Sequence, residues 1–334
     1  MLRGYLRELW HWWVDGWNRF WFSPADPATL GLLRALAGGM LLYTHAVWSL
    51  GLNDFFGPYS WVSPQAAREL YRGDVPWSWF WHISSPTLLW LLHTAALVVM
   101  AMFALGLFSR VTAVLSWLCA VAYAHRVPGA LFGLDQINAM LAMYLMLGPC
   151  GAAWSVDRWI ARWRSGRPLP PAVPSTAANL AVRLIQVHMC VIYFFAGVSK
   201  LQGQSWWAGT ALWGAVANLE YQTLDLTWMC HTPWLVALLT QATVWWELFF
   251  CVLVWPRLLR PLVLAFAVPL HLGIAVGMGM VTFGLVMLIG CASFVPPWLV
   301  RRLLGGGPAV PPAGVESGAP RAGRAMRRRR GARG

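Results

Sequence analysis

Long apolar stretches alternate with short polar segments along most of the chain. Eight of these stretches approach the roughly 20 residues that a helix needs to cross a bilayer. They cover residues 29–51, 86–108, 111–126, 130–150, 176–201, 233–255, 258–277 and 279–299. We therefore predict an all-α, polytopic integral membrane bundle of about eight transmembrane helices.

The segments around these stretches differ in character. Residues 1–28 mix charged residues with tryptophans, which predicts an N-terminal amphipathic helix at the membrane interface. Residues 202–232 are too polar to span and too aromatic for a free loop, so we expect a short outer cap. Residues 303–334 are rich in Gly, Pro and Arg, which predicts a disordered tail after a membrane domain of residues 29–302.

Composition agrees with the membrane class and predicts an orientation. Charged residues make up 11% of the chain, whereas an ordinary soluble domain has about 25%. With the N-terminus inside, the inner loops and the tail hold 19 basic residues and the outer loops hold 4. The positive-inside rule then predicts that both termini lie in the cytoplasm, and we expect the membrane to be a bacterial-type cytoplasmic (inner) membrane. We expect the basic residues of the inner loops and the tail to interact with the lipid bilayer rather than with nucleic acid.

The fifth predicted span carries the most ordered set of polar residues. Spacings of three and four residues separate Arg183, Gln186, Cys190, Tyr193, Gly197 and Lys200. Helical geometry places them on one face, and we expect this face to point into the bundle because lipid penalises polar groups. Glu247 in the sixth span supplies an acid at a similar expected depth, so we predict a structural ion pair between Arg183 and Glu247.

Lys200 is the only lysine of the chain, and the other 24 basic residues are arginines. A lysine at the end of a span commonly extends its amine to the membrane surface. Arginine keeps its charge at ordinary pH, however, whereas a desolvated lysine can lose its proton. The alternative to a surface anchor is therefore a base or nucleophile, and Lys200 becomes the candidate catalytic residue.

The sequence around this lysine resembles a known family. The segment YFFAGVSKLQGQSWWAG, from Tyr193 to Gly209, resembles the signature of the vitamin K-dependent γ-glutamyl carboxylases. It also resembles their bacterial relatives, the HTTM (horizontally transferred transmembrane) domain proteins. Leu134–Asp157 and Phe266–Pro297 agree with the same pattern, so the resemblance covers roughly residues 25–300.

The resemblance implies a carboxylase-like membrane enzyme, a lyase that uses reduced vitamin K or another quinone, with the family's essential lysine at Lys200. Asp135 and His271 would tune this lysine or hold the quinone. Further side chains from the same segments would line an outward-facing pocket: Gln136, Asn138, Tyr193, Trp206 and Trp207. The carboxylases have a histidine near the position of Asp135, and this chain does not. The prediction is therefore quinone oxygenation, or another proton transfer on a lipid-like substrate, rather than peptide carboxylation.

The residues alone leave two other classes of function open. Charged groups in several spans also suit a transporter, or a protein that binds a small molecule or lipid without catalysis. A non-catalytic scaffold would instead use the Arg-rich tail as its contact surface. The six cysteines lie mostly in apolar stretches without paired spacing, so we expect neither disulfides nor a metal site.

Overall fold

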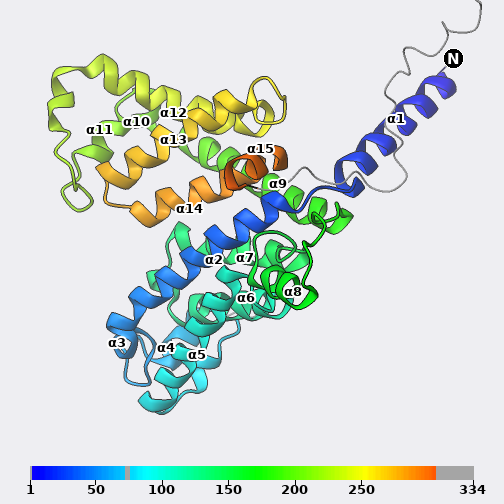
Figure 1. Cartoon of the computed structure of the whole chain (residues 1–334). Coiled ribbons are helices and arrows are strands. Elements are labelled where there is room, and N and C mark those ends of the chain that lie inside the picture. Colours follow the sequence, from blue (N-terminus) through cyan, green and yellow to red (C-terminus); the bar gives the residue numbers. More distant parts are fainter. Residues whose placement is uncertain (1, 72–75, 306–334) are drawn as a thin grey trace, which may run out of the picture.

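The computed structural model describes residues 2–71 and 76–305, and helices dominate it. Each of the eight stretches predicted to span the membrane contains a helix (Figure 1). In chain order these helices are α2 (Ala28–Trp48), α5 (Pro86–Leu105), α6 (Ser109–Arg126), α7 (Gly133–Leu147), α9 (Thr176–Leu201), α12 (Pro233–Leu253), α13 (Arg260–Gly277) and α14 (Val281–Cys291). Among the described residues, strand-like pairing is limited to one bridge between Ala25 and Ser175. The all-α prediction is confirmed.

By the criteria of length and hydropathy, fewer helices than the predicted eight can span the membrane. Five helical segments of the described chain are long and apolar enough to cross: Ala28–Phe56, Pro86–Leu105, Thr176–Leu201, Pro233–Leu253 and Arg260–Gly277. A sixth is added if α14 and α15 (Pro297–Leu304), which are bent by 115°, form one span. Helix α6 contains two arginines and α7 has 15 residues, so both fall short. A multi-pass bundle is thus supported, whereas the predicted count of eight is not confirmed.

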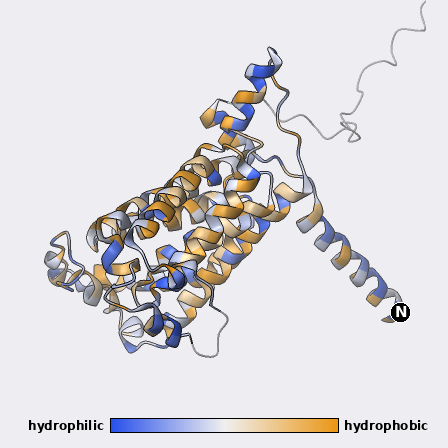
Figure 2. Ribbon diagram, turned by 90° about the horizontal axis from the view of Figure 1, so that it is seen from below, coloured by the Kyte–Doolittle hydropathy of each residue, from blue (hydrophilic) through white to orange (hydrophobic). Residues whose placement is uncertain are grey.

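Helix α9 joins two groups of helices. In the first group α2, α5, α6 and α7 pack against one another, and in the second α12 and α14 pack against α13 (Figure 1). Helix α9 contacts both α7 and α12. Much of the ribbon of the helical bundle is hydrophobic (Figure 2). Gln186, Cys190, Tyr193 and Gly197 of α9 are buried, which confirms that the polar face of this helix points into the bundle.

The segments outside the long helices are also largely helical. Helix α1 (Leu2–Phe22) extends away from the bundle (Figure 2), and Trp10, Trp13 and Trp17 stack along it with ring centroids 5.6 Å apart. Its predicted position at the membrane interface stays a prediction. The expected outer cap consists of α10 (Gln204–Trp207), α11 (Ala211–Val216) and a 3₁₀ turn at Thr227–His231. The predicted disordered tail, residues 303–334, begins too early, because Leu303 and Leu304 belong to α15 (Pro297–Leu304); residues 306–334 lie outside the described residues.

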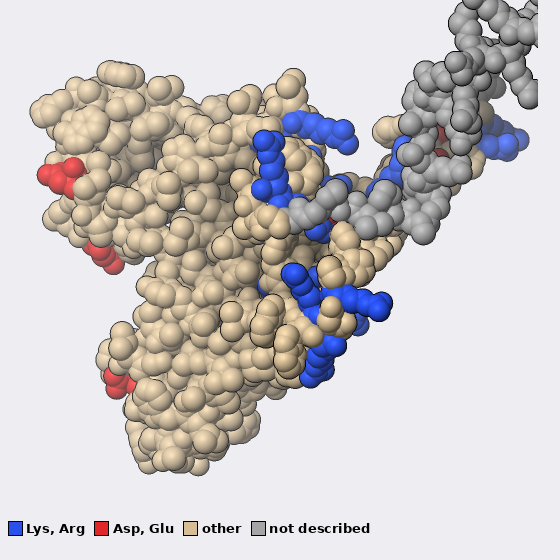
Figure 3. Space-filling model, in the orientation of Figure 1, with Lys and Arg blue, Asp and Glu red and all other residues tan. Residues whose placement is uncertain are grey.

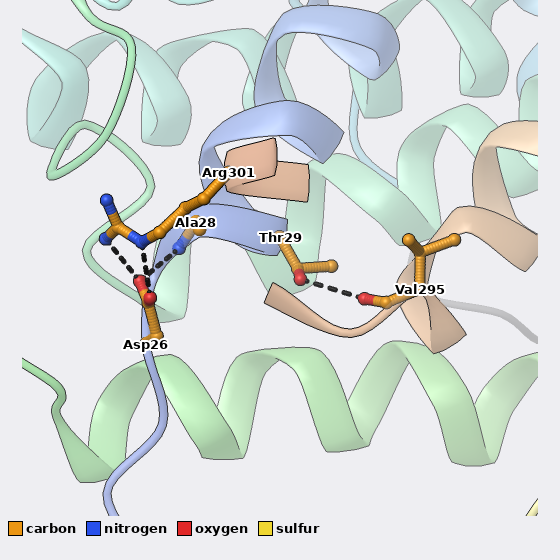
Figure 4. A network of polar contacts seen from close by, with 5 residues as sticks. All are labelled: Asp26, Ala28, Thr29, Val295 and Arg301. Carbon is orange, nitrogen blue, oxygen red and sulfur yellow. Dashed lines mark hydrogen bonds and ion pairs between the residues drawn. The ribbon is translucent and has the colours of Figure 1, made fainter. Parts of the chain in front are cut away.

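An ion pair ties the start of α2 to α15 (Figure 4). Nε and Nη2 of Arg301 each lie 2.6 Å from a different carboxylate oxygen of Asp26. Asp26 also accepts the backbone N–H of Ala28 at 3.0 Å, which caps the first turn of α2. Beside it, the hydroxyl of Thr29 donates to the carbonyl of Val295 at 3.0 Å. The two ends of the described membrane domain are therefore fastened together.

Three short helices lie in the connections between long ones, and the sequence did not predict them. Helices α3 (Leu52–Phe56) and α4 (Pro64–Glu69) follow α2, and α8 (Val156–Ser165) follows α7. Asp157 of α8 caps the next helix in space, α6. Its carboxylate accepts the backbone N–H groups of Phe108 and Ser109 at 2.7 and 2.9 Å and the hydroxyl of Ser109 at 2.7 Å. Partial burial alone would raise the pKa of Asp157, but these hydrogen bonds outweigh it and hold the pKa below its usual 3.8.

Replacing Asp157 tests this cap. We expect Asp157→Asn to lower the free energy of unfolding by about 1 kcal/mol at neutral pH, because the charged acceptor at the start of α6 is lost. Because the pKa of Asp157 is lower in the folded than in the unfolded state, its carboxylate contributes fully to the free energy of unfolding when the pH is above the unfolded pKa. This contribution is lost as the pH falls through the folded pKa. Thermal unfolding in detergent should therefore show wild type and variant converging below about pH 4. A difference that is constant with pH would contradict the assignment.

Candidate functional site

A glycine brings α9 and α12 into close contact at the candidate site. A Cβ atom at Gly197 would lie 2.8 Å from Cγ and 3.0 Å from the backbone nitrogen of Leu248. Any side chain there would push the two helices apart, because backbone atoms cannot yield as a flexible side chain can. The glycine in the family-like segment AGVSKL thus has a packing role, and it sets the positions of the residues next to it.

This close contact places Lys200 beside Glu247. Nζ of Lys200 lies 2.6 Å from Oε2 of Glu247, and the two side chains are 20% and 11% exposed. Glu247 lies six residues before the end of α12, within a segment long and apolar enough to span the membrane. The sole lysine is therefore held in an ion pair between helices, rather than extended into solvent.

The predicted ion pair between Arg183 and Glu247 is wrong. Nη1 of Arg183 donates to Oε1 of Gln186 at 2.9 Å, and its guanidinium lies 4.4 Å from the ring centre of Phe20. Arg183 precedes Lys200 by 17 residues on α9, which corresponds to about 25 Å along the axis. Glu247 is level with the far end of α9, so only Lys200 reaches it.

Trp206 completes the surroundings of Lys200. The amine lies 5.2 Å from the centre of the Trp206 ring, a distance at which cation and ring attract. The amide of Gln241 fixes α10 to α12 by donating to the carbonyl of Trp206 at 2.7 Å. Trp207 instead donates its indole N–H to the carbonyl of Leu201 at 2.6 Å, and its side chain is exposed. Of the two predicted tryptophans, only Trp206 contacts the lysine.

Tyr193 and His271 form a second polar cluster next to this pair. The Tyr193 hydroxyl lies 2.7 Å from Nε2 of His271 and 3.2 Å from Sγ of Cys291. The cluster joins α9, α13 and α14, and His271 is 3% exposed. Nδ1 of His271 is buried without a hydrogen-bond partner among the described residues. A buried ring nitrogen without a partner is a position at which a ligand or a water can bind.

The ring of Tyr193 connects the two clusters. It lies 4.9 Å from the ring of Trp246 and 4.4 Å from that of Phe250, which flank Glu247 on α12. Tyr193 and Lys200 are seven residues apart, so they lie on the same face of α9 two turns apart. Lys200 and Tyr193 therefore lie on the face of α9 that packs against α12, and His271 of α13 contacts this face at Tyr193.

The polar residues at the start of α7 form a separate group. Asp135 accepts the backbone N–H of Phe132 at 2.9 Å and so caps α7. It lines a cavity of about 370 Å³ with Trp48 and Tyr123, and Lys200 is not among the lining residues of this cavity. Gln136 is exposed, whereas Asn138 is buried with its Oδ1 atom unpartnered. The structure does not bring Asp135, Gln136 or Asn138 into contact with Lys200.

The sequence did not single out a hydrogen-bonded chain beside that cavity. The Tyr123 hydroxyl lies 2.5 Å from Nδ1 of His93, whose Nε2 lies 2.8 Å from the hydroxyl of Ser49. The hydroxyl of a tyrosine buried in a membrane span needs a hydrogen-bond partner. The position of Tyr123 within a predicted span could therefore have indicated a polar partner nearby. Within the described residues, no group of three His, Cys, Asp or Glu side chains could hold a metal ion.

The chain is similar to a known protein family. A family model described as the HTTM domain matches residues 22–298. No curated protein matches, and no solved structure matches.

A double-mutant cycle tests the ion pair. We expect Lys200→Met or Glu247→Leu alone to lower the free energy of unfolding by about 3 kcal/mol, because each leaves an unpaired charge in an apolar site. The double variant should be clearly less destabilised than the sum of the single ones, as measured by unfolding in detergent. Glu220→Gln, an exposed site on the outer segment, is the control and should change little. Additive effects of the two single variants would contradict the pairing.

Proposed function

The chain belongs to the HTTM domain family, and from that premise we propose that it is a membrane-embedded enzyme with a lysine-centred site. Lys200 removes a proton from a reduced quinone or another lipid-like substrate, and Glu247 is its partner in that transfer. The reaction class is that of the carboxylase-like superfamily, namely removal of a ring-hydroxyl proton from the reduced quinone, with dioxygen as the oxidant that then oxygenates the ring.

The observation that carries this proposal is the ion pair of the only lysine with Glu247 inside the bundle. An amine and a carboxylate 2.6 Å apart can exist as an ion pair or, after one proton moves, as two neutral groups. A site with little water lowers the cost of the neutral form. Lys200 can then accept a proton, whereas an arginine in its place would stay charged.

Aromatic rings and one unpartnered polar atom near the pair support the choice of a quinone. Trp206 and Trp246 offer aromatic faces, and Nδ1 of His271 is a buried polar atom without a partner. A bound reduced quinone would supply an acidic ring hydroxyl as the proton donor. Trp206 would position the ring beside Lys200, and His271, oriented by its hydrogen bond to Tyr193, would bind a polar group of the substrate.

The distribution of charge supports the predicted orientation. Arginines gather at the end of the bundle that holds α8 and α15, whereas the acidic residues visible on this face of the bundle lie at the opposite end (Figures 1 and 3). This asymmetry favours a cytoplasmic membrane protein of bacterial type, with the arginine-rich end and both termini inside. The site at Lys200 would then be reached from the outer half of the membrane.

Substitution of the lysine by arginine separates a chemical role from a structural one. Lys200→Arg keeps a positive charge beside Glu247, so we expect an unfolding midpoint close to that of the wild type. Its turnover of reduced vitamin K in lipid nanodiscs, followed by chromatography under air, should fall by about 100-fold or more, since arginine cannot accept the proton.

The matched control is Arg110→Lys, at the opposite, arginine-rich end of the bundle, which should leave turnover unchanged. Full turnover by Lys200→Arg would exclude Lys200 as the base. Proton uptake coupled to substrate movement across vesicles, without chemical change of the quinone, would favour transport instead.

A further inference from the structure

Arg34 is a buried cation without an adequate partner. Its side chain is 1% exposed, and its Nη2 atom donates to the carbonyl of Trp154 at 2.6 Å. Its Nε and Nη1 atoms are buried and have no hydrogen-bond partner among the described residues. Gly106, with a φ of +73°, makes room for the guanidinium, because a Cβ there would collide with it. The fold thus preserves a charged group whose burial is costly unless an anion binds it.

Arg34 lines a large cavity at the arginine-rich end of the bundle. The cavity has a volume of about 840 Å³ and lies between the end of α5, the start of α8 and the segment that precedes α9. Arg158, Arg162 and Arg301 line it together with Arg34. Its other lining residues include apolar side chains, among them Leu105, Trp154, Trp159 and Leu169. The cavity therefore combines a cationic portion with apolar walls.

The acidic residues near the cavity already interact with other groups of the protein. Asp26 binds Arg301 through both carboxylate oxygens. Asp157 interacts electrostatically with Arg34, but both of its oxygens accept hydrogen bonds at the start of α6. Arg158 donates to a neutral carbonyl, that of Pro170, at 2.5 Å, and Arg162 is exposed. Positive charge thus exceeds negative charge along this wall.

We propose that this cavity binds a phosphate group through Arg158 and Arg162, with the buried charge of Arg34 behind the same wall. Guanidinium groups bind phosphate through paired, charge-assisted hydrogen bonds, and a further positive charge close by strengthens the attraction. The apolar walls match the hydrocarbon part of an anionic phospholipid, and the volume suits a ligand of that size. The segment after Gly305 is an unsuitable occupant, because it carries seven arginines and one acid.

The test compares phosphate-bearing probes on the purified full-length chain. Native mass spectrometry would measure retention of phosphatidylglycerol and of phosphatidylcholine, and glycerol 3-phosphate would be titrated as the soluble probe. The wild type should retain phosphatidylglycerol in preference to phosphatidylcholine. The double variant Arg158→Gln with Arg162→Gln should bind it about tenfold more weakly or worse.

Arg164→Gln is the matched control, because Arg164 is exposed on the same helix and does not line the cavity. It should change binding less than about twofold if the cavity, rather than general surface charge, is responsible. Arg34→Met is a further variant, but it removes a buried side chain, so the double variant at the rim carries the test if Arg34→Met fails to fold.

The outcomes separate the sources of the phosphate. Selective loss of phosphatidylglycerol in the double variant supports a lipid headgroup, and selective loss of glycerol 3-phosphate binding supports a soluble phosphate. Equal losses in Arg164→Gln and in the double variant would overturn the proposal. Binding of phosphatidylglycerol and phosphatidylcholine with equal affinity, without binding of glycerol 3-phosphate, would also overturn it.

Discussion

A charge inside an apolar helical bundle must be compensated by the protein, and in this chain Glu247 compensates Lys200. The pair lies where α9 and α12 come closest, and the closeness depends on Gly197, which has no side chain to separate it from Leu248. Trp206 covers the amine from α10. Gly197 lets Lys200 and Glu247 come into contact, and Trp206 reduces the contact of the amine with water. Both features therefore serve the ion pair.

The two ends of the bundle satisfy the same constraint in different ways. At the Lys200 end one cation meets one acid, and the buried network of Tyr193, His271 and Cys291 lies two helical turns below. At the other end Arg301 is neutralised by Asp26, whereas Arg34 keeps two nitrogens without partners beside a cavity. A neutralised pair suits proton transfer within the protein. An excess of cations suits an anion from outside it.

Much of the fold could be predicted from the sequence because membrane helices are local features. Apolar length defined all eight helical stretches, and the boundaries of 176–201 agree with α9 to the residue. The shorter helix α8 was missed because its arginines resemble those of an inner loop, although its period is that of an amphipathic helix. Its Asp157 caps α6, a contact between segments almost 50 residues apart that no local pattern contains.

The candidate site was only partly predictable, since helix pairing depends on offsets between helices. Counting residues from each membrane surface placed Glu247 at the depth of Arg183. In the structure, however, α9 and α12 are offset along their axes so that Glu247 lies beside Lys200. The lone lysine was identifiable by its chemistry, as was the inward face with Tyr193. The grouping of Asp135 with Lys200 was suggested by the family resemblance and by their similar expected depth in the membrane, but Asp135 lines a different cavity.

A zero-length cross-link tests the Lys200–Glu247 contact most directly, because the chain has a single lysine. A membrane-permeable carbodiimide joins an amine to a carboxylate only when the two are in contact, and peptide mass spectrometry would identify the product. The account predicts an amide between the α9 and α12 peptides at Lys200 and Glu247 that is absent from Glu247→Gln. Cross-linking of Lys200 to Glu220 or Asp225 of the outer segment, with none to Glu247, would contradict it.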